Sequence, residues 1–248
     1  MIFLNQLTEA TKLSRDVLKA CEDLRRGGFV LVYDADNREG ETDLFFAAQH
    51  ATPAKVKALR SDAGGLVFLA VDNAIARALG LPFMEDVFQS ASHEHPVLEG
   101  LAPGKLGYDK RQSFSITINH RNAFTGVTDN DRAFTIGEFA RLSELATASP
   151  GASAQAAFGK SFRAPGHVHL CVAAAGLLEE RKGHTELGVA LARLAGVTPV
   201  MAGAEMLGDG VALDRWEAEE WADKRNAVVL EGELIEEVWL ELQEALKN

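Results

Sequence analysis

Cysteine is scarce in this chain of 248 residues, which has only Cys21 and Cys171. Each lies in an apolar, periodic stretch, which predicts buried thiols and argues against a disulfide framework or a cysteine-based zinc site. No apolar run approaches the roughly 20 residues that a membrane-spanning helix needs. The first residues lack the basic start and long apolar stretch of a secretory signal. We therefore expect a cytoplasmic protein with no membrane partner.

Basic residues are fewer than acidic ones: 25 Lys and Arg stand against 36 Asp and Glu, a formal net charge of −11 at pH 7. Nucleic-acid binding requires a basic face that neutralises phosphates, so this balance argues against a nucleic-acid partner. An anionic small molecule would need a local basic cluster to hold it against the overall field. The hydrophobic fraction of 47% and the charged fraction of 25% are those of an ordinary globular protein.

Strand-like apolar stretches alternate with helical patterns along the chain. Strands are expected at 29–33, 44–48, 66–71, 113–119, 167–174, 199–207 and 227–231. Helices are expected at 14–26, after Thr52-Pro53, from Asp72 to Gly80, from the Thr135/Glu138 capping box to Ala146, at 186–196, at 214–225 and at the end of the chain. Loops are expected at 82–112 and 147–165. Because the first two strands can run antiparallel, the pattern predicts one α+β domain over residues 1–248, a mixed-sheet α/β layered sandwich.

Between the first two strands lies an acidic segment, Asp34 to Asp43, with five carboxylates and one arginine. It could be a solvated hairpin loop. Its flanking strands are strongly apolar, however, and would fix both of its ends, as a functional site requires. Clustered carboxylates suit a hard cation such as Mg²⁺, which takes one or two protein oxygens and completes its shell with water and substrate.

A second segment, Arg181-Lys-Gly-His-Thr-Glu186, precedes a predicted helix. Free backbone N–H groups at a helix N-terminus favour an anion, and the hydroxyl of Thr185 adds a donor. Arg181 and Lys182 add positive charge, so the segment predicts a phosphate site. Alternatively, Thr185 only caps the helix, and His184 is either a neighbour of the cap or a metal ligand.

Two further residues and one segment are candidates for a functional role. His167 follows Pro165-Gly166 at the start of a strand and is suited to acid–base work, although a lone histidine is more often structural. Glu205 lies in an otherwise apolar strand, where a carboxylate is costly unless it is paired or hydrogen-bonded. The turn-rich segment from Thr125 to Arg132 is otherwise typical of a loop.

Two other patterns suggest a binding site but are weak: a phosphate-binding loop and a pair of histidines. Gly159-Lys160-Ser161 lacks the first glycine of a phosphate-binding loop, since residue 154 is alanine, and no strand precedes it. His93 and His95 could ligate a metal, but such a pair in a loop is more often solvated.

Taken in order, these segments closely resemble the 3,4-dihydroxy-2-butanone 4-phosphate synthase family of riboflavin biosynthesis. The resemblance runs from about residue 12 to 232. It is carried by Asp34, Arg38-Glu39, Glu41, Asp43, Thr125-Gly-Val-Thr128, Asp131-Arg132, Pro165-Gly-His-Val168, Arg181 to Glu186, and Glu205. No cyclohydrolase-like domain follows, so a monofunctional form is expected. The segment 93–112, within a stretch near 90–112, looks like a loop insertion relative to shorter members.

The resemblance implies a lyase that converts D-ribulose 5-phosphate into 3,4-dihydroxy-2-butanone 4-phosphate and formate through metal-stabilised enediolates. It implies Mg²⁺ or Mn²⁺ held by Glu39 and His184, catalysis by His167 and Glu205, and a homodimer with its sites at the subunit interface. The implied substrate-binding set is Asp34, Arg38, Glu39, Glu41, Asp43, Thr128, Arg181, Lys182, Gly183, His184, Thr185 and Glu205.

The chain departs from the family pattern at three positions: Ala164 precedes Pro165, Val172 replaces an arginine, and Phe68 replaces a cysteine. These departures leave open a non-catalytic relative that binds a sugar phosphate. A metal-dependent isomerase or aldolase acting on another pentose phosphate would use the same acidic loop and phosphate site, and the identity of the products would distinguish it.

Overall fold

The central element is a mixed β-sheet. The computed structural model describes residues 15–101, 109, 111–148 and 150–247, so the start of the chain and part of the expected loop at 82–112 lie outside the described residues. Within them, seven strands form one sheet in the order β4-β5-β3-β6-β2-β1-β7. Their bounds are Val30–Tyr33 (β1), Thr42–Ala47 (β2), Phe68–Val71 (β3), Phe114–His120 (β4), Phe162–Val172 (β5), Val200–Glu205 (β6) and Val228–Glu231 (β7).

The pairing of these strands is both parallel and antiparallel. β1 runs parallel to β7, and β3 runs parallel to β5. The other neighbours, including β1 with β2, are antiparallel. The predicted mixed-sheet α+β architecture is therefore confirmed.

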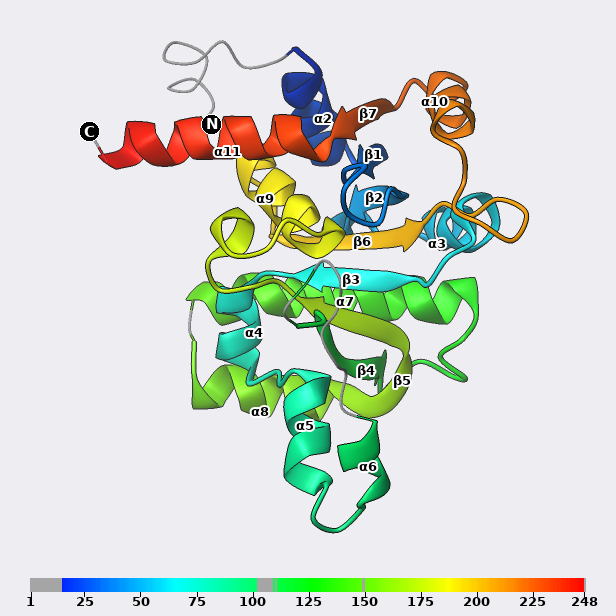
Figure 1. The fold of residues 1–248 in the computed structure, drawn as a ribbon. Helices are drawn as coiled ribbons and strands as arrows, with labels where there is room; N and C mark the ends of the chain where they lie inside the picture. Colours follow the sequence, from blue (N-terminus) through cyan, green and yellow to red (C-terminus); the bar gives the residue numbers. More distant parts are fainter. Residues whose placement is uncertain (1–14, 102–108, 110, 149, 248) are drawn as a thin grey trace.

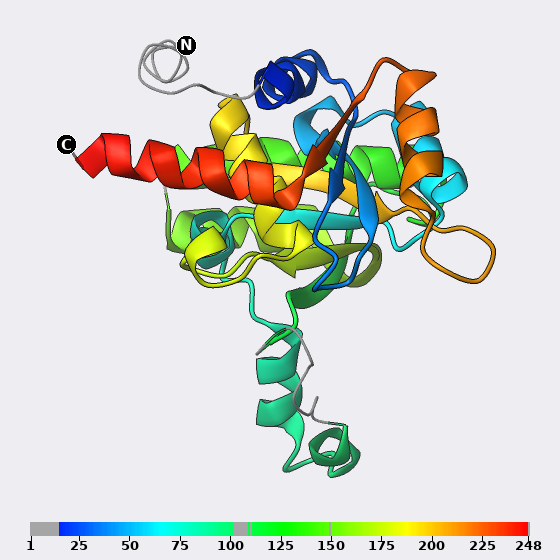
Figure 2. The same cartoon turned by 45° about the horizontal axis from the view of Figure 1, so that its top comes forward.

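Helices cover both faces of the sheet (Figure 1). One face packs against α2 (Arg15–Arg26), α9 (His184–Ala195) and α11 (Gly232–Lys247). The other packs against α3 (Pro53–Ala58), α4 (Asn73–Leu79), α7 (Asp129–Ala148), α8 (Ala152–Ser161) and α10 (Arg215–Asp223). Two short helices, α5 (Met84–Ala91) and α6 (Val97–Gly100), project from this sandwich (Figure 2).

The three layers follow because successive apolar side chains of a strand point to opposite faces of the sheet. Val30 and Phe45 point to the face of α2 and α9, whereas Leu31 and Leu44 point to the face of α7. All four side chains are fully buried. Because both faces of the sheet are covered, its strands read as continuous hydrophobic runs.

Several predicted helix ends are confirmed. The Oγ1 atom of Thr52 accepts a hydrogen bond from the backbone N–H of Lys55, and Pro53 is the first residue of α3. Asp72 caps α4, and Gly80 ends it in the left-handed conformation. Cys21 and Cys171 are free and buried as predicted, and burial raises the pKa of the Cys21 thiol to about 11 against the opposing charge of Arg25.

The capping box predicted at Thr135 is wrong. Helix α7 begins at Asp129. The side-chain oxygen of the preceding residue, Thr128, accepts a hydrogen bond from the backbone N–H of Asp131. Thr135 lies inside the helix and is fully buried. Its hydroxyl accepts a hydrogen bond from the N–H of His120, so it ties α7 to the end of β4.

Both predicted loops also contain regular structure. Residues 152–161 form α8 and β5 begins at Phe162, where 147–165 was expected to be irregular. The cause is tertiary: Ala154 is buried in the core, and Phe158 stacks on Phe162. In the expected loop at 82–112, α5 and α6 occupy part of the described residues. None of the described helices has both the length and the hydrophobicity to cross a bilayer.

Candidate active site

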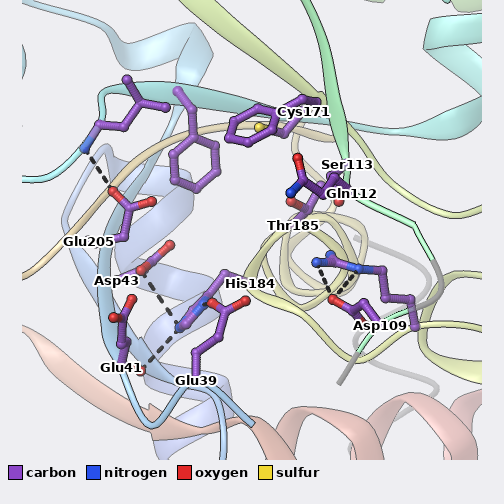
Figure 3. Close-up of a pocket in the computed structure, with 14 residues that line it drawn as sticks. Glu39, Glu41, Asp43, Asp109, Gln112, Ser113, Cys171, His184, Thr185 and Glu205 are labelled. Atoms are coloured by element: carbon purple, nitrogen blue, oxygen red, sulfur yellow. Dashed lines mark hydrogen bonds and ion pairs between the residues drawn. The ribbon is translucent and has the colours of Figure 1, made fainter. Parts of the chain in front are cut away.

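A polar cavity of about 320 Å³ opens between the acidic loop, the start of α9 and the ends of several strands (Figure 3). It brings together residues that lie far apart in the sequence. Its lining is Glu39, Glu41, Asp43, Leu66, Phe68, Asp109, Gln112, Ser113, Phe114, Cys171, Arg181, His184, Thr185 and Glu205.

Strand pairing places two carboxylates side by side in this cavity. Asp43 at the start of β2 is the antiparallel partner of Glu205 at the end of β6, so both side chains share one face of the sheet. Glu205 is half-buried at its strand end rather than enclosed within an apolar strand. One of its carboxylate oxygens, Oε2, accepts a hydrogen bond of 2.8 Å from the N–H of Leu66.

The backbone at Gly65 holds Glu205 from behind. The N–H of Gly65 donates to the Glu205 carbonyl at 2.9 Å. A Cβ atom on Gly65 would lie 2.4 Å from the Oε2 atom of Glu205, which no side chain tolerates. Glycine is therefore required for the carboxylate to occupy this position.

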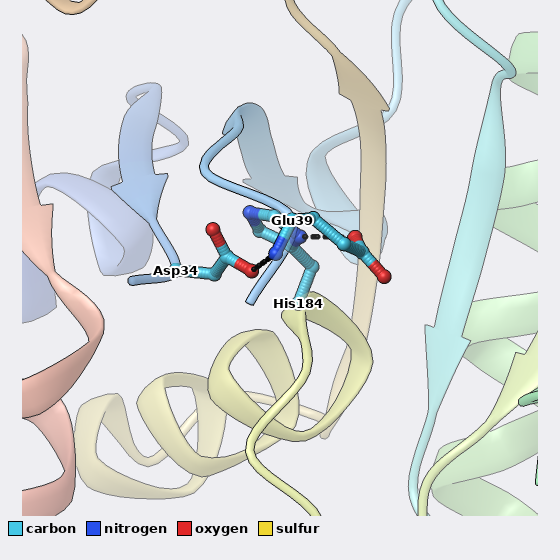
Figure 4. A group of neighbouring side chains, drawn as sticks. All are labelled: Asp34, Glu39 and His184. Carbon is cyan, nitrogen blue, oxygen red and sulfur yellow. Dashed lines mark hydrogen bonds and ion pairs between the residues drawn. The ribbon is translucent and has the colours of Figure 1, made fainter. Parts of the chain in front are cut away.

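The acidic loop is shaped by Asp34. Its two carboxylate oxygens accept hydrogen bonds from the N–H groups of Glu39 and Glu41, at 3.0 and 3.1 Å. Gly40 between them adopts a φ of +68°, a conformation that favours glycine. Asp34 thus folds the loop whose residues Glu39 and Glu41 line the cavity, while Asp34 itself is not part of the lining. Figure 4 shows Asp34 and Glu39 beside His184 at the start of α9.

His184, the first residue of α9, is the buried imidazole of the site, with 7% of its surface exposed. Its Nε2 atom lies 3.1 Å from the carbonyl oxygen of Glu41. A carbonyl only accepts hydrogen bonds, so Nε2 carries the proton. The Nδ1 atom lies 3.5 Å from the Oε2 atom of Glu39, and the neutral ring would direct its lone pair to that side.

Charges in the cavity shift the protonation of its groups. Burial alone would lower the pKa of His184, but the carboxylates of Asp43, Glu39 and Asp34 outweigh it and raise that pKa to about 9. Burial, with the like charges of Glu205, Glu39 and Glu41, raises the pKa of Asp43 to about 8 although His184 opposes the rise. The hydrogen bond from His184 lowers the pKa of Glu39.

The opposite side of the cavity carries positive charge. Arg181 contacts Asp109 through Nη2 at 2.6 Å and contacts the buried Glu186 through Nη1 at 2.5 Å. Arg38 also reaches Asp109, with Nη2 at 3.2 Å, and its Nε lies 3.6 Å from Asp34. The two guanidinium groups therefore meet at one carboxylate, that of Asp109, which is labelled in Figure 3.

The donor set fits a divalent cation. Ligand atoms of Asp34, Glu39 and His184 lie within 4.8 Å of one another, which makes them the one such group among the described residues. Asp43 also turns a buried Oδ1 atom into this region, and that atom accepts no hydrogen bond from any described residue. Carboxylate oxygens suit Mg²⁺ and Mn²⁺, and a neutral imidazole suits transition metals. His93 and His95 belong to no such group among the described residues.

The remaining predicted site residues do not line the cavity, and neither does Arg38. Lys182 pairs with Glu236 of α11, and Gly183 is the residue before α9. Thr128 caps α7. His167 is exposed on β5, and it does not line the cavity.

The orientation of His167 is fixed by Asn119, a residue that sequence reasoning missed. The side-chain oxygen of Asn119 accepts from the N–H of His167 at 2.8 Å, and its amide nitrogen lies 3.1 Å from His167 Nδ1. A Cβ atom on Gly126 would lie 2.0 Å from that amide, so the Thr125-Gly126 turn packs directly on Asn119. The turn-rich segment thus supports the histidine.

Other lining residues were also missed. Gln112 and Ser113 precede β4, Phe114 is its first residue, and Leu66 precedes β3. Asp109 comes from the expected insertion. The feature that identifies Asp109 as a site residue is its contact with Arg38 and Arg181. These residues are far apart in the sequence, so only the folded structure shows the contact.

Carboxylates, an imidazole and guanidinium groups that converge in one cavity at the ends of a mixed sheet define an enzyme, with an active site for a small polar molecule. The chain belongs to the 3,4-dihydroxy-2-butanone 4-phosphate synthase family, whose model matches residues 18–238.

Similar proteins agree with this assignment. The chain is 44% identical to 3,4-dihydroxy-2-butanone 4-phosphate synthase of Methanothermobacter thermautotrophicus, over 89% of this chain and 94% of that protein. It is 44% identical to the enzyme of the same name from Methanosarcina mazei, over 95% of this chain and 96% of that protein. A crystal structure of 3,4-dihydroxy-2-butanone 4-phosphate synthase in complex with two magnesium ions shares the fold, with a TM-score of 0.69, 24% identity, and coverage of 90% of this chain and 95% of that one.

Proposed function

We propose that this enzyme converts D-ribulose 5-phosphate into 3,4-dihydroxy-2-butanone 4-phosphate and formate. The observation that carries the proposal is the convergence of Glu39, His184, Glu205 and Arg181 on one cavity. Arg38 lies behind this lining and contacts the lining residue Asp109. Membership of the family supports the same reaction.

The metal site we propose consists of Glu39 and His184, with Asp34 and Asp43 close by. A bound Mg²⁺ or Mn²⁺ would stabilise the negative charge that develops on neighbouring oxygens when a proton next to a ketone is removed. One structure of this fold, a 3,4-dihydroxy-2-butanone 4-phosphate synthase, was solved in complex with two magnesium ions. The Nε2–H of His184, bonded to the Glu41 carbonyl, would hold the ring with Nδ1 toward the cation.

Arg38, Arg181 and Thr185 would bind the phosphate of the sugar. Both guanidinium groups already converge on a single anion, the carboxylate of Asp109. Thr185 lines the cavity in the first turn of α9, where free N–H groups and the helix dipole favour negative charge. Lys182 and Gly183 adjoin this turn, and Lys182 would act through its charge alone.

Glu205 would move protons at the sugar carbons, since its carboxylate is fixed by the Leu66 N–H and faces the cavity. Asp43 lines the same side of the cavity, and burial raises the pKa of its carboxyl to about 8 although His184 opposes the rise. Glu41 lines the same side of the cavity. Of the two residues expected to catalyse proton transfer, Glu205 therefore lines this cavity and His167 does not.

His167 would reach the cavity of a partner subunit in a homodimer, together with Thr128. Two observations support this. Both residues lie outside the cavity of their own chain. The loop that packs on Asn119 carries strongly exposed apolar side chains, with Phe124 91% and Val127 52% exposed, as is typical of a protein interface. We propose that the dimer works in the cytoplasm.

The test is to incubate the purified full chain with D-ribulose 5-phosphate and Mg²⁺ and to measure formate and the four-carbon phosphate product. Formation of both in equal amounts supports the proposal. A five-carbon isomer without formate would identify a pentose-phosphate isomerase instead, and substrate binding with no turnover would identify a sugar-phosphate-binding relative. EDTA should abolish formate production, and added Mg²⁺ should restore it.

A further inference from the structure

Asp109 occupies the meeting point of two arginines. Its Oδ2 atom lies 2.6 Å from Arg181 Nη2, 2.9 Å from Arg181 Nε and 3.2 Å from Arg38 Nη2. Its side chain is 5% exposed. Such bidentate, charge-assisted contacts from guanidinium groups are the ones that proteins use to hold carboxylates and phosphates.

While Asp109 contacts both arginines, the local charges disfavour the binding of a second anion. Among the described residues, Arg181 and Arg38 are the two cationic side chains that contact Asp109. Asp34 and Glu186 already contact one arginine each, and Asp109 contacts both. A phosphate dianion beside all three carboxylates would meet a net negative field, at a site where screening by water is weak.

We propose that Asp109 is an intramolecular competitor of the substrate's phosphate group: its carboxylate occupies the position between Arg38 and Arg181 that the phosphate takes over. This inference rests on the proposed function only in assigning these two arginines to the phosphate. It gives the expected insertion near 90–112 a role, because Asp109 belongs to that segment and contacts both arginines.

The structure provides space for the exchange. A second cavity of about 360 Å³ adjoins the first and shares Asp109, Gln112, Ser113 and Arg181 with it. Asp109 therefore lines both cavities. Under this proposal, its carboxylate leaves the guanidinium groups by moving into that free volume.

The exchange has a thermodynamic consequence. Only the fraction of molecules in which Asp109 has left the arginines can bind phosphate, so the measured affinity is weaker than the intrinsic one by that fraction. Removing the charge of Asp109 should therefore tighten phosphate binding. If Asp109 instead contacted the substrate favourably, its removal would weaken binding.

The experiment is to titrate the full-length Asp109→Asn variant with inorganic phosphate in a calorimeter, without metal or sugar. We expect the Kd for phosphate to fall by roughly ten-fold relative to the parent chain. The reason is that phosphate no longer has to displace one charge-assisted hydrogen bond of the Asp109 carboxylate. A crystal structure of the parent chain with phosphate should show the anion on Arg38 and Arg181 and the Asp109 carboxylate displaced from both.

The matched control is Asp86→Asn. Asp86 pairs with Arg111, just beyond Asp109 in the chain, but does not line the cavity. Its substitution loosens the same segment and leaves the charge of Asp109, so its Kd for phosphate should stay within about twofold of the parent. Unchanged or weaker phosphate binding in Asp109→Asn would overturn the proposal, as would equal tightening in the control.

If Asp109→Asn does not fold, Asp109→Ala tests the same charge. A crystal structure of the parent with phosphate bound while Asp109 still contacts both arginines would also refute the inference. These measurements need no turnover, so a failure here is distinct from an absence of formate in the activity assay.

Discussion

The imidazole of His184 meets the carboxylate of Glu39 inside the cavity, with Nδ1 3.5 Å from Oε2. One residue begins a helix, and the other belongs to a loop between two strands near the start of the chain. The loop is held by Asp34, and the helix is buried against the sheet, so the fold keeps the pair together in the absence of a ligand. Such preorganisation suits a metal site.

If Glu39 and His184 hold the metal, Glu39→Gln and His184→Asn should each weaken Mn²⁺ binding by roughly 100-fold, because each removes a ligand. The measurement is the Kd for Mn²⁺ from calorimetry or from the paramagnetic resonance signal of free Mn²⁺. His95→Asn, at an exposed histidine outside the cavity, is the control and should bind like the parent. Parental affinity in both cavity variants would contradict the assignment.

The stability of the metal-free protein should fall as pH rises from about 6.5 to 9. The pKa of His184 rises from 6.5 to about 9 on folding, so the folded state binds the proton more tightly, and this stabilisation is present below 6.5 and lost through 9. The pKa of Asp43 rises from 3.8 to about 8, which has the same sign. The melting temperature in EDTA should drop by roughly 2–4 °C for each kcal/mol lost.

The control for this pH dependence is His184→Asn, whose melting temperature should vary less over the same range. Added Mn²⁺ should stabilise the parent more strongly as pH rises, since the cation competes with the proton on His184. A melting temperature in EDTA that stays level or rises between pH 6.5 and 9 would be inconsistent with these pKa values.

Gly65→Ala should lower kcat for formate release by roughly 100-fold, because the new Cβ would displace the Glu205 carboxylate, and misplacement by about 1 Å costs a factor of that order. Gly137→Ala is the matched control. Gly137 lies within α7 with no atom within 4 Å of an added Cβ, so the change should leave kcat unaltered and stabilise the helix by about 0.5–1 kcal/mol. Parental kcat in Gly65→Ala would show that the Glu205 position is not critical.

Hybrid dimers would test whether His167 acts across a subunit interface. His167→Ala and Glu205→Ala should each be inactive as pure dimers. A dimer with one chain of each kind, isolated by two different tags, would contain one site with both residues intact, so it should recover about half of the parental activity. Inactive hybrids would indicate that His167 serves its own chain.

The sequence predicted the sheet and the polar segments around the cavity because those signals are local. The apolar strands have the right composition, and Asp72 with Gly80 marks the two ends of a helix through short-range hydrogen bonds. The motif from Arg181 to Glu186 was correctly placed at the start of a helix, since α9 begins at His184. These features depend on neighbours in the chain.

The errors arose where distant contacts decide the structure. The stretch before β5 is rich in Ala, Ser and Gly and resembles a loop, yet burial of Ala154 makes it helical. Thr135 has the sequence pattern of a cap but serves as a partner for His120. The position of Asp109 beside Arg38 and Arg181 depends on three separate segments, and no local pattern encodes it.

The register of β2 against β6 has an evolutionary consequence. Asp43 and Glu205 share a face only because these two strands pair as they do, and a slip of one residue would turn one of the two carboxylates toward α7. Insertions or deletions within either strand would thus remove the chemistry even if the sheet still formed. Variation in length should be confined to segments outside these strands, such as the projecting helices α5 and α6.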